Sequence, residues 1–118
     1  MNNKKIIIGT AQYGLNYGVS NISGKTDEQE VKKILQYGKK NNLNYLDTSS
    51  HYGGAETLLG KLNIANWKVT TKYKTEEILV EKEKILKNLI KLIEKSRKKL
   101  GIKKIYSILL HNPELILN

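Results

Sequence analysis

Short apolar runs alternate with longer amphipathic stretches along this chain. The apolar runs are rich in isoleucine, leucine, valine and tyrosine and are bounded by polar residues or glycine, which is typical of strands. The predicted strands are Ile6–Ile8, Asn44–Thr48, Trp67–Tyr73 and Lys104–Leu110. Because the first run is apolar without interruption, we expect it to be buried on both faces, as strands of parallel sheets are.

Three stretches between the strands have the spacing of amphipathic helices. Thr26 is expected to cap the first helix, with Gln29 completing a capping box, and the helix ends at Asn41-Asn42. The segment before it, residues 13–24, is rich in glycine and asparagine and is predicted to be a loop.

The second predicted helix begins after the Gly53-Gly54 turn and stops by Asn63. The third is capped by Thr75 and runs as one long helix to a C-terminal stop at Gly101. Its leucines and isoleucines recur at helical intervals, so they form one face, and lysines fill the opposite face. We expect the apolar face to pack on a sheet. A short coiled coil is the alternative, but charged residues interrupt its seam.

Strands and helices therefore alternate in the order β-α-β-α-β-α-β. This alternation with short connections predicts an α/β fold with a parallel sheet and right-handed crossovers. The 118 residues suit a single domain, residues 1–118. They are too few for a closed eight-stranded α/β barrel, which needs about 250 residues.

Polar side chains follow three of the predicted strands at the point where each strand ends. Asp47 and Tyr52 follow the second strand, Lys72 lies at the end of the third, and His111 follows the fourth. Ligands bind at this edge of parallel α/β sheets, so the four residues together indicate a site. Each residue type alone is more often a loop or surface residue. We expect His51 to be a loop histidine without a role, and no metal site.

The formal charge of +10 raises the question of a nucleic-acid partner. Lysine supplies every basic residue except Arg97, whereas base and phosphate recognition favours arginine. Residues 68–104 contain 13 basic and 5 acidic residues, a local charge of +8. We interpret them as a solvated, lysine-rich helix face and expect no nucleic-acid partner.

The absence of cysteine excludes disulfides and thiolate chemistry. No segment approaches the roughly 20 apolar residues that a membrane span needs, so we expect no membrane association. The basic first residues are followed by too short an apolar run for a signal peptide, and a cytoplasmic location is the expectation.

At these residues the chain resembles the aldo-keto reductase family. Gly9-Thr10-Ala11 and Gly14 are similar to its first-strand segment, and residues 47–60 to its D-T-x-x-x-Y-G-x-x-E-x-x-L-G signature. Thr71-Lys72 and Leu110-His111 end the corresponding strands. The resemblance covers essentially all 118 residues. It implies about half of a TIM-type (β/α)8 barrel, with four strands and three to four helices.

The resemblance implies a reductase in which Tyr52 gives a proton to a carbonyl oxygen. Lys72 and Asp47 would be the electrostatic partners of Tyr52, and His111 would orient the substrate or relay a proton. The residue types suit these roles, because an ammonium beside a phenol favours proton loss and a carboxylate holds the ammonium in place. Hydrogen bonds from Tyr52 and His111 would stabilise the charge that develops on the oxygen.

The cofactor implied by the resemblance is NADPH or NADH, with Gly9, Thr10, Ala11 and Asp47 beside it and an aldehyde or ketone as substrate. In the family, most other cofactor contacts come from later strands. We therefore expect activity to need a second half-barrel, either a complementary half or another copy of this chain. The alternative is an inactive half-barrel that self-associates or binds an acidic partner through its lysine-rich helix.

Overall fold

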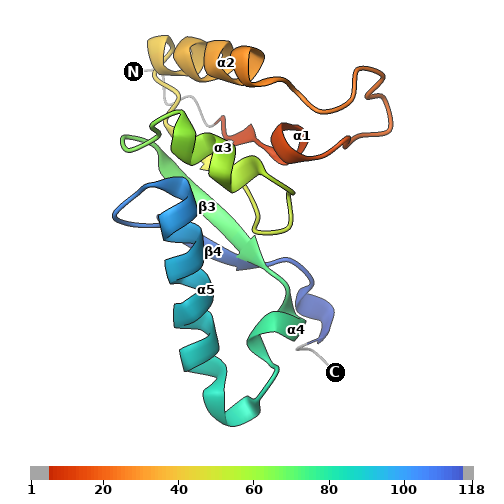
Figure 1. Cartoon of the computed structure of the whole chain (residues 1–118), viewed down its shortest axis with the longest axis vertical. Coiled ribbons are helices and arrows are strands. Elements are labelled where there is room, and N and C mark those ends of the chain that lie inside the picture. Colours follow the sequence, from red (N-terminus) through yellow and green to blue (C-terminus); the bar gives the residue numbers. More distant parts are fainter. Residues whose placement is uncertain (1–5, 116–118) are drawn as a thin grey trace.

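The computed structural model describes residues 6–115. Its four strands form one parallel sheet in the order β1-β2-β3-β4, with each strand hydrogen-bonded to the next (Figure 1). The elements are β1 (Ile8–Gly9), α1 (Ala11–Gly14), α2 (Glu28–Lys40), β2 (Tyr45–Asp47), α3 (Ala55–Lys61), β3 (Lys68–Tyr73), α4 (Thr75–Ile78), η1 (Lys82–Lys84), α5 (Ile85–Leu100), β4 (Ser107–Leu110) and η2 (Pro113–Leu115). The predicted α/β class and the alternation of strands with helices are confirmed.

Helices pack against one face of the sheet, and α3 and α5 lie side by side across β3 (Figure 1). Side chains of β3 alternate between two environments: Val69, Thr71 and Tyr73 are buried, whereas Lys68 is exposed and Lys72 half-buried. The core is made by apolar side chains of the strands, helices and connections, namely Tyr13, Val31, Leu35, Leu46, Ala55, Leu59, Ile64, Val69, Leu100 and Ile102. Burial of each large side chain stabilises the fold by about 1.5–3 kcal/mol.

The first strand is shorter and less buried than the sequence predicts. β1 spans only Ile8–Gly9, and the Ile6 and Ile7 side chains are 53% and 58% exposed. The expectation of burial on both faces is therefore wrong. Among residues 6–115, β1 is an edge strand that pairs only with β2, so the apolar residues before it meet no second strand there.

The start of α2 also differs from the prediction. The cap is Asp27, whose carboxylate accepts a hydrogen bond from the Glu30 backbone N–H at 2.9 Å. The backbone N–H of Thr26 instead donates to the Gln12 carbonyl at 2.8 Å, which ties Thr26 to the preceding loop. A capping box between Thr26 and Gln29 is therefore wrong, because the helix begins one residue later.

Residues 13 and 14, predicted to be loop, belong to the short helix α1. Its turn is closed by hydrogen bonds from Tyr13 N to the Thr10 carbonyl and from Leu15 N to the Ala11 carbonyl. Burial of the Tyr13 side chain holds this turn against the core, an effect of tertiary packing that the local composition does not indicate.

The long third helix is interrupted, contrary to the prediction. α4 ends at Ile78, η1 follows, and α5 begins at Ile85. Thr75 is not the cap: its backbone N–H and hydroxyl bind the side chain and carbonyl of Asn112, both at 2.9 Å. The Asn88 amide donates to the Ile78 carbonyl at 3.3 Å. Because α4 is fixed to the end of β4 while α5 packs on α3, the two cannot continue as one straight helix.

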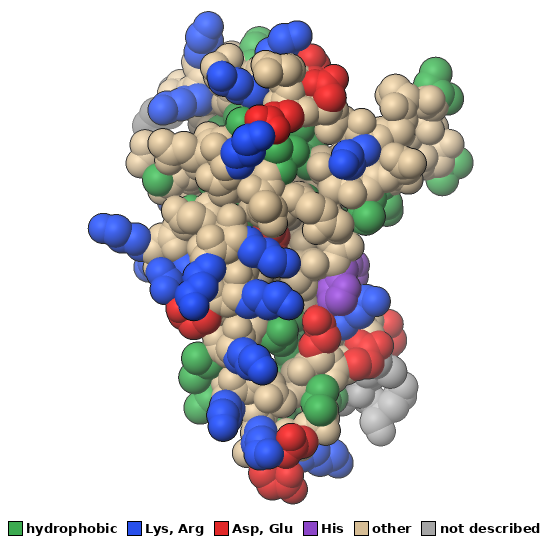
Figure 2. Space-filling view, viewed as in Figure 1, with side chains coloured by type: hydrophobic (Ala, Val, Ile, Leu, Met, Phe, Trp, Pro, Cys, Tyr) green, Lys and Arg blue, Asp and Glu red, His purple; other side chains and the backbone are tan. Residues whose placement is uncertain are grey.

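The lysine-rich face of α5 is exposed to solvent, as expected. Figure 2 shows Lys and Arg side chains distributed over this side of the molecule. Lys87, Lys91, Lys95 and Lys98 are exposed. Among residues 6–115, no helix combines the length and hydrophobicity that crossing a membrane requires.

The contact between α3 and α5 depends on Gly60. A Cβ atom built there would lie 1.9 Å from the Lys99 carbonyl oxygen, on backbone that cannot move aside cheaply. α5 ends just beyond, at Gly101, whose φ of 63° confirms the predicted left-handed stop. The two helix backbones therefore touch only because position 60 has no side chain.

Gly60→Ala should lower the free energy of unfolding by about 3 kcal/mol or more, since the added methyl group forces α3 and α5 apart. Gly54→Ala is the control, because a Cβ atom there meets nothing within 4 Å; since Gly54 caps α3, this change should cost only about 1 kcal/mol. Urea denaturation of both variants tests this. Equal stabilities would show that the helices do not pack as described.

Two buried tyrosines make stability sensitive to alkaline pH. Burial raises the pKa of Tyr13 and of Tyr73 to about 12. An unfolded tyrosine ionises near its ordinary pKa of about 10, so the stabilisation is fully present below that pH. We expect the free energy of unfolding to fall as pH rises from about 10 towards 12, and Tyr13→Phe to reduce the slope. Constant stability over this range would contradict the burial of both phenols.

Candidate functional site

Lys72 joins the ends of β2 and β3. The parallel register places Thr70 beside Asp47, so Lys72 lies two residues further along the same face of the sheet. Its ammonium group donates to both carboxylate oxygens of Asp47, each at 2.8 Å. The Lys72 side chain is only 15% exposed, so a carboxylate partner offsets part of the cost of removing its charge from water.

The same ammonium reaches the loop that follows β2. Lys72 Nζ donates to the Thr48 carbonyl at 3.0 Å and lies 3.4 Å from the Tyr52 hydroxyl. It also lies 5.1 Å from the centre of the Tyr52 ring. One cation therefore contacts a carboxylate and a phenol, which is the arrangement that the family resemblance implies at this edge of the sheet.

Two glycines allow the Tyr52 loop to approach α1 closely. A Cβ atom at Gly14 would lie 1.6 Å from the Tyr52 carbonyl oxygen, and one at Gly53 would lie 2.4 Å from the Gly14 carbonyl oxygen. Gly53 also has a φ of 55°, which favours glycine. The Tyr52 carbonyl accepts a hydrogen bond from Ala55 N at the start of α3. The backbone on both sides of Tyr52 is thus fixed.

His111 completes the group of predicted residues. Its backbone N–H donates to the Tyr73 carbonyl at 2.9 Å, which places it directly after β4 and beside the end of β3. The His111 ring lies edge-on to Tyr52, with ring centres 6.0 Å apart and an interplanar angle of 86°. Its Nδ1 atom lies 3.2 Å from the Ser49 hydroxyl oxygen. The structure therefore brings Asp47, Tyr52, Lys72 and His111 to one edge of the sheet.

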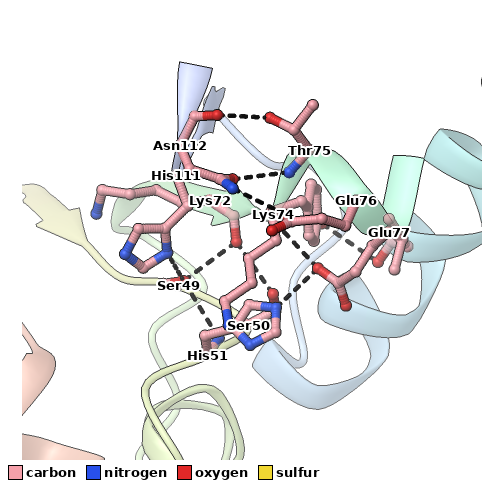
Figure 3. A network of polar contacts seen from close by, with 12 residues as sticks. Ser49, Ser50, His51, Lys72, Lys74, Thr75, Glu76, Glu77, His111 and Asn112 are labelled. Carbon is pink, nitrogen blue, oxygen red and sulfur yellow. Dashed lines mark hydrogen bonds and ion pairs between the residues drawn. The ribbon is translucent and has the colours of Figure 1, made fainter. Parts of the chain in front are cut away.

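Around this group, polar contacts hold together the β2–α3 loop, helix α4 and the segment that follows β4 (Figure 3). His51 Nε2 lies 2.7 Å from the Glu77 carboxylate, which links the β2–α3 loop to α4. Asn112 donates to Glu76 as well as accepting from Thr75. The expectation that His51 is a loop histidine without a role overlooked this contact. Its partner is distant in sequence, and no local pattern indicated it.

The residues expected beside a cofactor line a hollow of about 340 Å³. It is lined by Gly9, Thr10, Ala11, Gln12, Tyr17, Asp47 and Tyr52. A Cβ atom at Gly9 would meet nothing within 4 Å, so the backbone is open to the hollow there. Thr10 is fully buried, and its hydroxyl donates to the Asp47 carbonyl at 3.0 Å. Its side chain thus braces the end of β2.

Fold and site together define a class of protein. The four parallel strands and their helices form about half of a (β/α)8 barrel. The group of Asp47, Tyr52, Lys72 and His111 lies at the carboxyl edge of the sheet, where barrel enzymes bind ligands. The aldo/keto reductase family model matches residues 5–118. The chain belongs to this family.

Solved structures of the family share the fold. The PA4992 protein of Pseudomonas aeruginosa, described as a proposed aldo-keto reductase, is 21% identical with a TM-score of 0.71; the match covers 95% of this chain and 46% of that one. A second such structure from Pseudomonas aeruginosa is 20% identical, with a TM-score of 0.68 and coverages of 95% and 44%. The thermostable aldo-keto reductase Tm1743, in complex with the inhibitor epalrestat, is 21% identical, with a TM-score of 0.62 and coverages of 92% and 39%.

This chain therefore spans less than half the length of these structures. No curated protein sequence matches it significantly.

A double-mutant cycle measures the Lys72–Asp47 pair. Lys72→Met and Asp47→Asn should each destabilise the fold, and the double variant should lose less than the sum, with a coupling energy of about 1 kcal/mol or more. The partial exposure of Asp47 keeps this value below that of a fully buried pair. Chemical denaturation of the four proteins supplies the measurement. Strict additivity would show that the ammonium is held by other groups.

Proposed function

We propose that this chain carries the proton-donating half of an NAD(P)H-dependent carbonyl reductase. The observation that carries the proposal is the Lys72 ammonium, which contacts both oxygens of Asp47 and lies 3.4 Å from the Tyr52 hydroxyl. A cation beside a phenol stabilises the negative charge that the phenol oxygen takes on as it gives up its proton, so Lys72 suits transfer of a proton from Tyr52 to a substrate oxygen. Asp47 holds the cation in this position.

The neighbouring His111 suits the second contact to the substrate oxygen. Its ring lies edge-on to Tyr52 and is exposed, so an aldehyde or ketone oxygen in front of Tyr52 lies within reach of both side chains. Two hydrogen bonds directed at one oxygen stabilise the negative charge that develops there during reduction. In this proposal, Tyr52 gives the proton and His111 orients the carbonyl.

Gly9, Thr10, Ala11 and Asp47 are proposed to lie beside the cofactor. The hollow that they line also includes Tyr52, and the open backbone at Gly9 leaves room for a flat ring. When bound, NADPH or NADH supplies the hydride that the carbonyl carbon accepts. The residues of this chain line one side of that hollow, orient the carbonyl and supply the proton.

Activity is proposed to require a second half-barrel. The two edge strands are flanked by exposed apolar side chains: Ile6 and Ile7 precede β1, Tyr106 precedes β4, and Leu109 lies within β4 and is 48% exposed. Unpaired strand edges with such side chains favour association with further strands. The partner is either a complementary half-barrel or a second copy of this chain.

The alternative is a half-barrel without catalytic activity that self-associates or binds an acidic partner. The exposed lysines of α5 favour it, because they form a basic surface on this helix. Such a protein would show no response to cofactor or aldehyde.

Mixing the chain with NADPH and an aldehyde, alone and with a separately supplied C-terminal half-barrel of the family, tests the proposed reaction. We expect cofactor absorbance to fall when both halves are present, and Tyr52→Phe to lower the rate at least about 100-fold, because the proton donor is lost. Tyr37→Phe makes the same chemical change at an exposed position of α2 and should leave the rate unchanged. A rate that persists in Tyr52→Phe would exclude Tyr52 as the donor.

A further inference from the structure

Ser49 has a buried hydroxyl group that contacts two residues of the candidate site, Lys72 and His111. It is only 1% exposed, and its Oγ atom lies 3.2 Å from each of three groups: His111 Nδ1, the Lys72 carbonyl oxygen and the His51 backbone nitrogen (Figure 3). A hydroxyl has one proton to donate and two lone pairs that accept. The identity of each neighbour therefore decides which of them receives the Ser49 proton.

Two of the three neighbours have fixed roles. The His51 backbone N–H can only donate, so it uses one lone pair of Ser49. The Lys72 carbonyl can only accept, but it already receives the Ser50 hydroxyl at 3.0 Å and the Ser50 backbone N–H at 3.2 Å. These two bonds use both lone pairs of the carbonyl oxygen. Donation from Ser49 to the Lys72 carbonyl, at 3.2 Å, would be a third hydrogen bond on that oxygen, so His111 Nδ1 is the less crowded acceptor for the Ser49 proton.

We propose that Ser49 is a positioning residue that donates to His111 Nδ1 and so holds the neutral ring with its proton on Nε2. In a neutral imidazole one nitrogen donates and the other accepts, so an Nδ1 that accepts from Ser49 leaves Nε2–H as the donor. Ser49 contacts the His111 ring through this nitrogen, at 3.2 Å. The contact fixes both the ring orientation and its tautomer.

The catalytic consequence of this tautomer rests on the proposed reductase function. A carbonyl oxygen needs a hydrogen-bond donor, and His111 can serve as one while neutral only in the Nε2–H form. With the proton on Nδ1, the ring would present a lone pair to the substrate oxygen and repel it. Ser49 thus makes a neutral His111 suitable for orienting a carbonyl, although it does not touch the substrate itself.

Nitrogen NMR of the 15N-labelled chain at about pH 9, well above the ordinary histidine pKa of about 6.5, tests the tautomer without any turnover. The chain has only two histidines, so His51, bonded to Glu77, serves as an internal reference. We expect His111 to carry its proton on Nε2 and its Nδ1 to show the shift of a hydrogen-bonded acceptor. Ser49→Ala should remove that shift, Ser49→Thr should keep it, and Ser23→Ala, in an exposed loop, should change nothing.

An Nδ1–H ring in the unmodified chain, or an unchanged Nδ1 signal in Ser49→Ala, would overturn the proposal. If Ser49→Ala does not fold, the unmodified chain and Ser49→Thr still decide it. In the two-half activity assay, Ser49→Ala should lower kcat about tenfold and change KM by less than about twofold. An unchanged kcat would overturn the catalytic consequence. If Tyr52→Phe does not lower the rate in that assay, the proposed reductase function is rejected. The NMR result then still decides whether Ser49 donates to His111 Nδ1.

Discussion

The ion pair between Lys72 and Asp47 is the interaction on which the carboxyl edge of this sheet depends. A lysine that is 15% exposed needs a partner, because an unpaired ammonium out of water is costly. The parallel register of β2 and β3 supplies the carboxylate directly, and the same ammonium then binds the Thr48 carbonyl and approaches Tyr52. The Lys72 ammonium thereby holds together the end of β2, the end of β3 and the Tyr52 side chain.

The backbone around this pair is held by contacts that leave no room for side chains. Gly14 and Gly53 let α1 and the Tyr52 loop touch, and Gly60 lets α3 lie against the end of α5. Next to the site, Ser49 of the β2–α3 loop lies 3.2 Å from both the Lys72 carbonyl oxygen and His111 Nδ1. Packing and hydrogen bonding thus act on the same few residues, so the candidate site rests on rigid elements although Tyr52 and His111 lie in connections.

The two edges of the sheet give this half-barrel its other physical property. A closed barrel has no free strand edges, whereas β1 and β4 here each pair with one strand and are flanked by exposed apolar side chains. The two Pseudomonas aeruginosa structures are each somewhat more than twice as long as this chain. Within residues 6–115, the chain thus combines an ordered set of polar residues at one edge of its sheet with two outer strands that each pair with a single neighbour.

The sequence by itself determined the class of fold and the position of the polar residues. Hydrophobic runs and helical spacing depend on neighbours within a few residues, so they located the four strands, the parallel alternation and the glycine stop of α5. Order along the chain also placed Asp47, Lys72 and His111 at the same edge, because strands of a parallel sheet all end there. The family signature added the expected roles, which remain predictions.

Tertiary structure decided what depended on distant partners. Asn112 binds Thr75 and thereby helps to break the predicted long helix, and the Gln12 carbonyl moves the cap of α2 from Thr26 to Asp27. The contacts of Ser49 with Lys72 and His111 span 23 and 62 residues. No local pattern encodes such pairs. They form only when the parallel register and the packing of the helices bring separate segments together.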